Sequence, residues 1–138
     1  MPERVVISEY DEYGNPSPAI VTKSNVGTVL TRLSTAITAT TVGSDLAVGT
    51  YKELTLDINI SAVSGTSPTY DLDVQRRGSD GVYYSIYKTT SQTAVGVVSV
   101  TIGVGAEINK GFGDTIRIVE TVGGTTPSFT RSISIKGK

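Results

Sequence analysis

Apolar and polar residues alternate along the chain between Lys52 and Val74. The apolar residues occupy every second position on either side of a short interruption: Leu54, Leu56, Ile58, Ile60, Tyr70, Leu72 and Val74. A period of two with one apolar face is typical of a half-buried strand. The interruption, residues 64–68, contains Gly and Pro, which favour a turn at the edge of a sheet. The pattern predicts a hairpin whose tip is residues 64–68.

The C-terminal part of the chain repeats this arrangement. Strands are predicted over residues 115–122 and 128–136, with a second hairpin tip at residues 123–127. Between the two hairpins, Asp80-Gly81 indicates a turn, followed by strands over residues 82–88 and 94–104. One core is expected from both hairpins, with these members: Leu54, Leu56, Ile58, Ile60, Leu72, Val74, Ile116, Ile118, Ile133 and Ile135.

The two predicted tips carry almost the same phrase. Residues 63–70 read VSGTSPTY, and residues 122–129, which begin 59 positions later, read VGGTTPSF. Either an internal duplication or convergence on a favourable turn explains the likeness. A shift by 59 sets Ile58 against Arg117, so a duplication requires a β-bulge in one copy.

Composition extends the β prediction to the whole chain. Thr, Val and Ile together number 49, whereas Leu and Ala together number 13, and β-branched residues favour strands over helices. We expect a single antiparallel β-sandwich domain, jelly-roll or immunoglobulin-like, of about seven or eight strands over residues 25–138. Within its first 20 residues, 28–34 are compatible with one helical turn and 35–42 favour a strand.

The first 24 residues have a different character. They include three of the five prolines, and this indicates an extended N-terminal arm rather than a compact unit. The arm also carries apolar and aromatic residues that gain by lying on another surface. Those expected to contact a partner are Val5, Ile7, Tyr10, Tyr13 and Ile20.

Charge and residue types exclude several functions. The 138 residues carry 12 Lys plus Arg and 13 Asp plus Glu, a net charge of −1, which does not favour nucleic acid or an anionic membrane. No apolar run is long enough for a signal peptide or a membrane helix, so we expect the protein to be made and kept in a cytoplasm, or to be carried out by something other than a secretion signal. The chain has no His and no Cys, so we expect no enzyme activity and no cofactor.

Three carboxylates are the best candidates for a metal or glycosidase site. Asp71 and Asp73 share one face of a strand, and a hairpin at residues 64–68 would place Asp57 opposite them. A solvated face that keeps the sheet soluble is the favoured interpretation, so no catalytic or metal site is predicted.

Two further features indicate contacts. Tyr83 and Tyr87 are expected to share a face of one strand, where they could stack on a sugar, contact another protein, or divide between core and rim. Arg131 interrupts the apolar face formed by Phe129, Ile133 and Ile135. It must therefore lie at an edge, reach solvent, face another subunit, or pair with a carboxylate, for which Asp114 and Glu120 are candidates.

From Leu46 to its end the chain resembles small β-sandwich virion structural proteins of tailed bacteriophages and prophages. The resemblance rests on four elements: Ala62 to Thr69, the alternating Asp and apolar residues of Tyr70 to Val74, the Ser-Asp-Gly hairpin of Ser79 to Tyr84, and Thr115 to Thr130. The chain departs from the pattern at Glu120, where an aromatic residue is expected, and at Arg131, where an apolar residue is expected.

The resemblance implies a capsid decoration or head-stabilising protein. It implies a location in the virion after assembly in the host cytoplasm, and the major capsid protein or another virion protein as partner. It also implies a homo-oligomer, which we expect to be a trimer because capsid lattices offer threefold sites. The arm and Arg131 would contact the capsid or a neighbouring subunit. The alternative is a carbohydrate- or receptor-binding module of a tail fibre, with Tyr83 and Tyr87 at the binding site.

Overall fold

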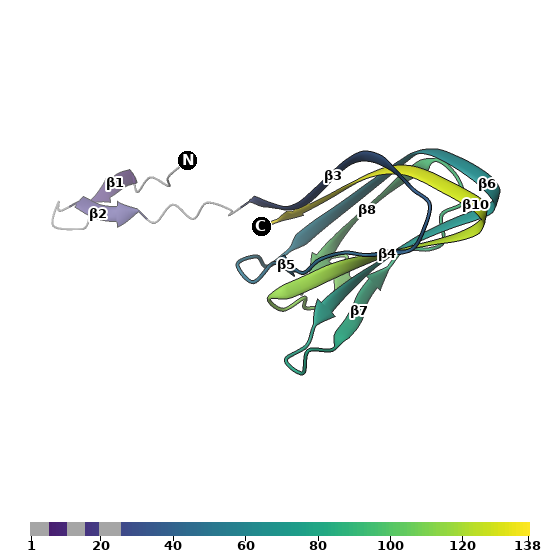
Figure 1. Cartoon of the computed structure of the whole chain (residues 1–138). Coiled ribbons are helices and arrows are strands. Elements are labelled where there is room, and N and C mark those ends of the chain that lie inside the picture. Colours follow the sequence, from purple (N-terminus) through teal and green to yellow (C-terminus); the bar gives the residue numbers. More distant parts are fainter. Residues whose placement is uncertain (1–5, 11–15, 20–25) are drawn as a thin grey trace.

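The computed structural model describes residues 6–10, 16–19 and 26–138, and the described residues are all β (Figure 1). The all-β prediction is therefore confirmed. The strands are β1 (Val6–Tyr10), β2 (Pro16–Ala19), β3 (Gly27–Ile37), β4 (Thr41–Val42), β5 (Leu46–Ala47), β6 (Leu54–Arg77), β7 (Tyr83–Lys88), β8 (Gly96–Gly103), β9 (Ile108–Asn109) and β10 (Thr115–Gly137).

Two very long strands organise the fold. β6 has 24 residues and β10 has 23, and they pair antiparallel from Ile116 opposite Arg76 to Gly137 opposite Leu54. The predicted hairpin tips at residues 64–68 and 123–127 are therefore wrong, because each strand continues through its Gly-Pro phrase. The two phrases lie against each other, with Thr66 opposite Thr125. There the two-stranded ribbon bends sharply and returns (Figure 1).

The bend divides one sheet into two layers. The first layer contains β3, the second half of β10, the first half of β6, β8 and β9. The second layer contains β7, the second half of β6, the first half of β10, and the short strands β4 and β5. These eight strands form one open sheet, and β8 and β9 pair parallel, so the predicted arrangement of antiparallel strands only is wrong.

Backbone conformation explains the bend. Gly65 and Gly124 both have φ of 109°, and Ser67 and Thr126 have φ of 48° and 46°. Glycine is required at the first pair, because a Cβ on Gly65 would lie 2.7 Å from the Thr126 carbonyl oxygen and one on Gly124 would lie 2.7 Å from that of Ser67. The ladder skips both prolines, which have no N–H to donate.

The two phrases are related by an approximate twofold rotation within the chain. Exchanging β6 with β10, β3 with β7, and β8 with β4 and β5 converts the first layer into the second. Ala62 lies opposite Thr130 while Ile60 lies opposite Arg131, so Ser61 is an extra residue in β6. Without it, Leu56 and Ile58 correspond to Ile116 and Ile118, and Ile60 corresponds to Glu120. This is the bulge that a duplication requires, and the correspondence favours a duplication over convergence.

The core lies between the layers. All ten residues predicted for it are buried, together with Tyr70, Phe129, Val48, Ile86, Ile102 and Phe112. The rings of Tyr70 and Phe129, equivalent positions of the two phrases, lie 5.5 Å apart. Apolar burial of this extent supplies the main favourable contribution to folding.

Two expectations for the N-terminal part need adjustment. Residues 28–34 belong to β3 rather than to a helical turn, because β3 pairs antiparallel with β10 along its length, from Gly27 opposite Gly137 to Ile37 opposite Phe129. Within the predicted arm, β1 and β2 pair antiparallel, with Val6 opposite Ala19 and Tyr10 opposite Pro16. These two strands form a separate two-stranded sheet.

Candidate functional site

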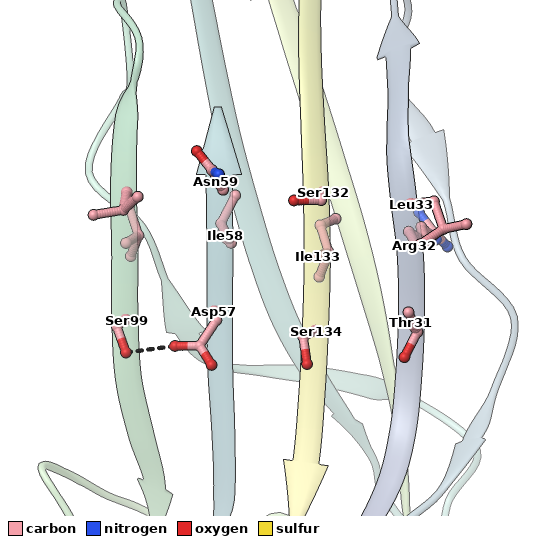
Figure 2. Close-up of a pocket in the computed structure, with 12 residues that line it drawn as sticks. Thr31, Arg32, Leu33, Asp57, Ile58, Asn59, Ser99, Ser132, Ile133 and Ser134 are labelled. Carbon is pink, nitrogen blue, oxygen red and sulfur yellow. Dashed lines mark hydrogen bonds between the residues drawn. The ribbon is translucent and has the colours of Figure 1, made fainter. Parts of the chain in front are cut away.

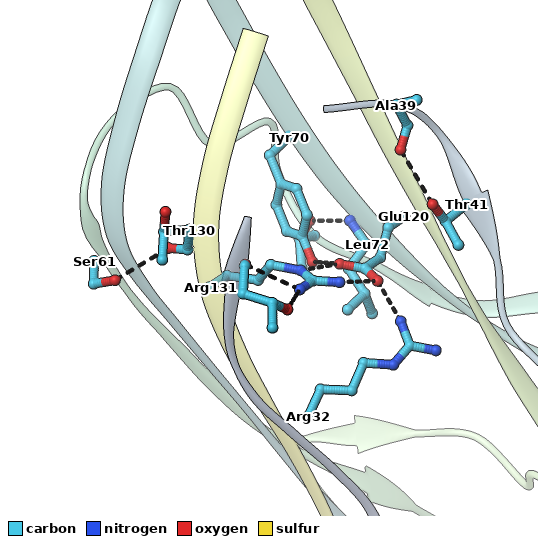
Figure 3. Close-up of polar contacts among 11 residues, drawn as sticks. Arg32, Ala39, Thr41, Ser61, Tyr70, Leu72, Glu120, Thr130 and Arg131 are labelled. Carbon is cyan, nitrogen blue, oxygen red and sulfur yellow. Dashed lines mark hydrogen bonds and ion pairs between the residues drawn. The ribbon is translucent and has the colours of Figure 1, made fainter. Parts of the chain in front are cut away.

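A buried ionic cluster joins the two layers next to the bend (Figure 3). Arg131 donates from Nε to Glu120 Oε2 at 2.6 Å and from Nη2 to Oε1 at 2.8 Å. The Tyr70 hydroxyl donates to the same carboxylate at 2.7 Å, and Arg32 of β3 donates to Oε1. Arg131 also donates from Nη1 to the carbonyl and hydroxyl oxygens of Thr35. Every buried side-chain polar atom among the described residues has a partner.

The cluster keeps Glu120 ionised. Burial alone would raise the pKa of Glu120, but the hydrogen bonds from Arg131 and Tyr70 and the charges of Arg131 and Arg32 outweigh burial and lower it. The hydrogen bond to Glu120 raises the pKa of Arg131, and burial followed by the Glu120 charge raises that of Tyr70. Arg32, Tyr70 and Arg131 therefore surround a carboxylate that is charged at neutral pH.

Arg131 pairs within its own chain. Of the two carboxylates considered from the sequence, Glu120 is the partner rather than Asp114. Arg131 is buried, so its placement at an edge, in solvent or against another subunit is wrong. Glu120 and Arg131 are also the two positions where the chain departs from the virion-protein pattern, and the structure shows them to be one interaction.

The tyrosines of β7 do not share a face. The pairing of β7 with β6 shifts between Gln75 and Val74, so the alternation of side chains is interrupted between Ser85 and Tyr87. Tyr87 lies opposite buried Val74 and packs against the core, and its burial raises its pKa. Tyr83 lies on the outer side, opposite exposed Arg77. The predicted pair for stacking on a sugar is therefore absent.

The side chain of Tyr83 already makes two contacts within the chain. The Arg117 guanidinium lies 3.5 Å from the ring centroid, and the hydroxyl donates to Asp45 at 2.5 Å. The hydrogen bond to Asp45 raises the pKa of Tyr83. One face of the ring and its polar tip are thus used within the chain.

The three candidate carboxylates are separated by the bend. Asp57 lies in the first layer and accepts from Ser99 at 2.5 Å, whereas Asp73 lies in the second and accepts from Gln75 at 2.8 Å and from Ser85. Asp71 accepts from Ser91 at 3.5 Å. The expectation that Asp57 lies opposite Asp71 and Asp73 depended on a hairpin that does not form. Over residues 6–10, 16–19 and 26–138, no three acidic side chains gather as metal ligands would.

A shallow hollow lies on the outer face of the first layer (Figure 2). It has a volume of about 390 Å³ and crosses four adjacent strands, β8, β6, β10 and β3. Small polar side chains form its floor, among them Asp57, Asn59, Ser132 and Ser134. Leu33 on β3 and Val97 on β8 flank it and are 76% and 75% exposed.

Sequence reasoning found only part of this surface. The outward direction of Asp57 and Asn59 followed from their alternation with Leu56 and Ile58. Leu33 was missed because residues 28–34 were not assigned to a strand. Ser132 and Ser134 joined the same surface only through the pairing of β6 with β10, for which the sequence gives no direct signal.

The predicted contact residues of the N-terminal segment are only partly placed. Ile7 and Tyr10 belong to β1, whereas Val5, Tyr13 and Ile20 lie outside the described residues. Their contacts with a partner stay predictions.

Comparisons with known proteins found no relative of the chain. No protein-family model, curated protein or solved structure matches the chain. Among the residues that the structure covers, no helix has the length and apolar character needed to span a membrane.

Proposed function

We propose that the protein is a non-enzymatic bacteriophage virion component, a capsid decoration or head-stabilising protein. The observation that carries the proposal is the pairing of the two Gly-Thr-hydroxyl-Pro phrases at the bend. These phrases are the most distinctive elements of the resemblance to phage virion proteins. The two phrases pair with each other and form the bend between the layers. The resemblance therefore covers the structural element that sets how the two layers are arranged.

The polar groups support a structural role. Three carboxylates of the described residues are engaged within the chain: Glu120 with two arginines, Asp45 with Tyr83, and Asp80 with Tyr84 at 2.6 Å. A general acid or base must instead reach the proton that it transfers. These internal contacts support a structural role for the sheet.

The finer fold class belongs to the proposal. We infer that the sheet, folded over on itself, acts as a β-sandwich in which the bend replaces the loops between two sheets. The buried faces of the layers pack against one core, as the two sheets of a jelly-roll or immunoglobulin-like domain do.

Partners follow from the same proposal. The N-terminal segment would bind the major capsid protein or a neighbouring subunit, with Ile7 and Tyr10 among its contacts. A homo-oligomer in the virion is part of the proposal, and the resemblance gives it three copies. An isolated two-stranded hairpin such as β1–β2 is marginally stable in water, which supports a bound state for this segment.

A binding assay with phage capsids tests the role. Capsids prepared without the protein should retain the purified full chain on sedimentation. A chain lacking residues 2–24 should keep its β circular dichroism spectrum but bind more weakly. Full-length protein that stays in the supernatant contradicts the decoration role, whereas a truncated chain that binds equally well contradicts only the role of the arm.

The second candidate is a carbohydrate- or receptor-binding module of a tail fibre. It relied on Tyr83 and Tyr87 as a stacking pair. Since these residues lie on different faces, this candidate retains less support than the first.

A further inference from the structure

The outer faces of the two layers differ in charge although the layers are related by pseudo-twofold symmetry. On the first layer only Asp57 and Lys136 are charged among the outward residues of the strands. The second layer carries a larger set: Asp71, Asp73, Arg77, Lys88 and Arg117. Depletion of charge is the compositional mark of the centre of a protein interface. This contrast favours the first layer over the second as a contact surface.

The residues of that face form two rows across four strands. One row reads Val97, Asn59, Ser132 and Leu33, from β8 through β6 and β10 to β3. The next row reads Ser99, Asp57, Ser134 and Thr31. The first row therefore has an apolar residue at each end and two polar residues in the middle. Figure 2 labels three of the four, Asn59, Ser132 and Leu33.

We propose that this face binds the same face of a second copy of the chain, related by a twofold axis that runs along the strands between β6 and β10. Rotation about this axis places Leu33 of one copy over Val97 of the second copy, and the reverse. Both side chains, three-quarters exposed in the single chain, are then covered. Burying such apolar surface favours association.

The polar middle is complementary under the same rotation. Asn59 faces Ser132 of the second copy, and Asp57 faces Ser134 of the second copy. The two carboxylates do not face each other, and each gains a hydroxyl donor. Stacked sheets lie about 10 Å apart, so side chains or bridging waters of the two copies would fill the hollow.

This inference is independent of the virion role, because it requires only the geometry of one face. It differs from the threefold arrangement that the resemblance implies, since face-to-face packing about a twofold axis closes at two copies. The stoichiometry of the free protein therefore separates the two.

Sedimentation equilibrium of the full chain tests the proposal. The chain should be a dimer at micromolar concentration. Ser132→Arg places a long charged side chain in the middle of the face and should weaken dimerisation about tenfold or more. The matched control Thr121→Arg makes the same kind of change on β10 in the outer face of the second layer, and should leave the dimer unchanged.

Crosslinking locates the contact in the dimer. Because the chain has no Cys, Leu33→Cys and Val97→Cys each introduce a single thiol. A bifunctional thiol reagent with a span of about 10 Å should join the two variants when they are mixed. Neither should crosslink as efficiently alone, since identical residues are displaced sideways by three strand spacings, about 14 Å. A monomer, a trimer, a dimer equally sensitive to both arginine variants, or equal crosslinking in all samples would overturn the proposal.

Discussion

Arg131 is a charged residue on the face of β10 that otherwise carries buried apolar side chains, and its contacts with Glu120 stabilise it there. Its neighbours on the same face, Phe129 and Ile133, are fully buried, and its guanidinium is satisfied by Glu120 and Thr35. Removing one member of a buried ion pair leaves the other charge without its partner, which costs about 3–5 kcal/mol. Replacing both members by apolar residues of similar size avoids that cost.

Arg131→Met should therefore lower the free energy of unfolding by about 3–5 kcal/mol. The double variant Glu120→Met/Arg131→Met should be less destabilised than the sum of the single variants, because it removes both fully buried charges and leaves only the partly exposed Arg32 without its carboxylate. Urea denaturation of the four proteins measures this coupling. Additive single effects would show that the pair does not act as a unit.

The depressed pKa of Glu120 predicts a pH dependence. An unfolded Glu titrates near about 4.3, and the folded pKa lies below the ordinary value, so the stabilisation is complete above the unfolded pKa. It is lost as the pH falls through the folded pKa. The melting temperature should therefore fall as the pH is lowered below about 4.3.

Glu120→Gln should have a weaker acid dependence than the parent chain. Asp80→Asn is the control: the hydrogen bond from Tyr84 lowers the pKa of Asp80, but this carboxylate is exposed and its contribution is screened. If the acid dependence of Glu120→Gln equals that of the parent while Asp80→Asn removes it, the cluster is not its source.

The sequence predicted that Arg131 lies at an edge, reaches solvent, faces another subunit or pairs with a carboxylate. Glu120 was one of the two carboxylates named as its partner. It could not choose between them, because Glu120 and Asp114 both precede the bend, and only the return of β10 decides which meets Arg131. Arg32 and Thr35 could not be inferred, since β3 was not recognised as the strand beside β10.

At the scale of elements, the Gly-Pro phrases have the local chemistry of a turn yet form a bend in continuous strands. Alternation correctly predicted the strands on either side of each phrase and the faces of their side chains. It could not show that β6 and β10 pair with each other instead of each folding back on itself. That choice depends on contacts between residues about 60 positions apart, such as Thr66 with Thr125.

The bend makes a specific prediction for its glycines. Gly65→Ala should destabilise the chain substantially more than Gly105→Ala, as measured by thermal denaturation. Both residues have positive φ, 109° and 83°, but an added Cβ meets backbone atoms only at Gly65 and has open space at Gly105. Equal effects of the two substitutions would mean that the close approach of the phrases does not determine the bend.

On the scale of the whole molecule, β6 and β10 pair with each other through both layers. Because the two layers share this pairing, we expect them to unfold together. Leu56→Ala in the first layer and Leu72→Ala in the second should each cost about 2–5 kcal/mol and shift one common transition. Val104→Ala, at an exposed position outside the proposed dimer face, serves as the control and should change stability little. Separate transitions for the two layers, followed by fluorescence and circular dichroism, would contradict a single cooperative unit.

The proposed virion role is tested most directly by locating the protein in phage particles. Particles produced by cells that encode the chain would be purified, and an epitope-tagged copy located on them by immunogold electron microscopy. The account predicts label at regular positions on the particle heads, and the chain among the proteins of the purified particles. A chain that is abundant in the cells but missing from purified particles would contradict it.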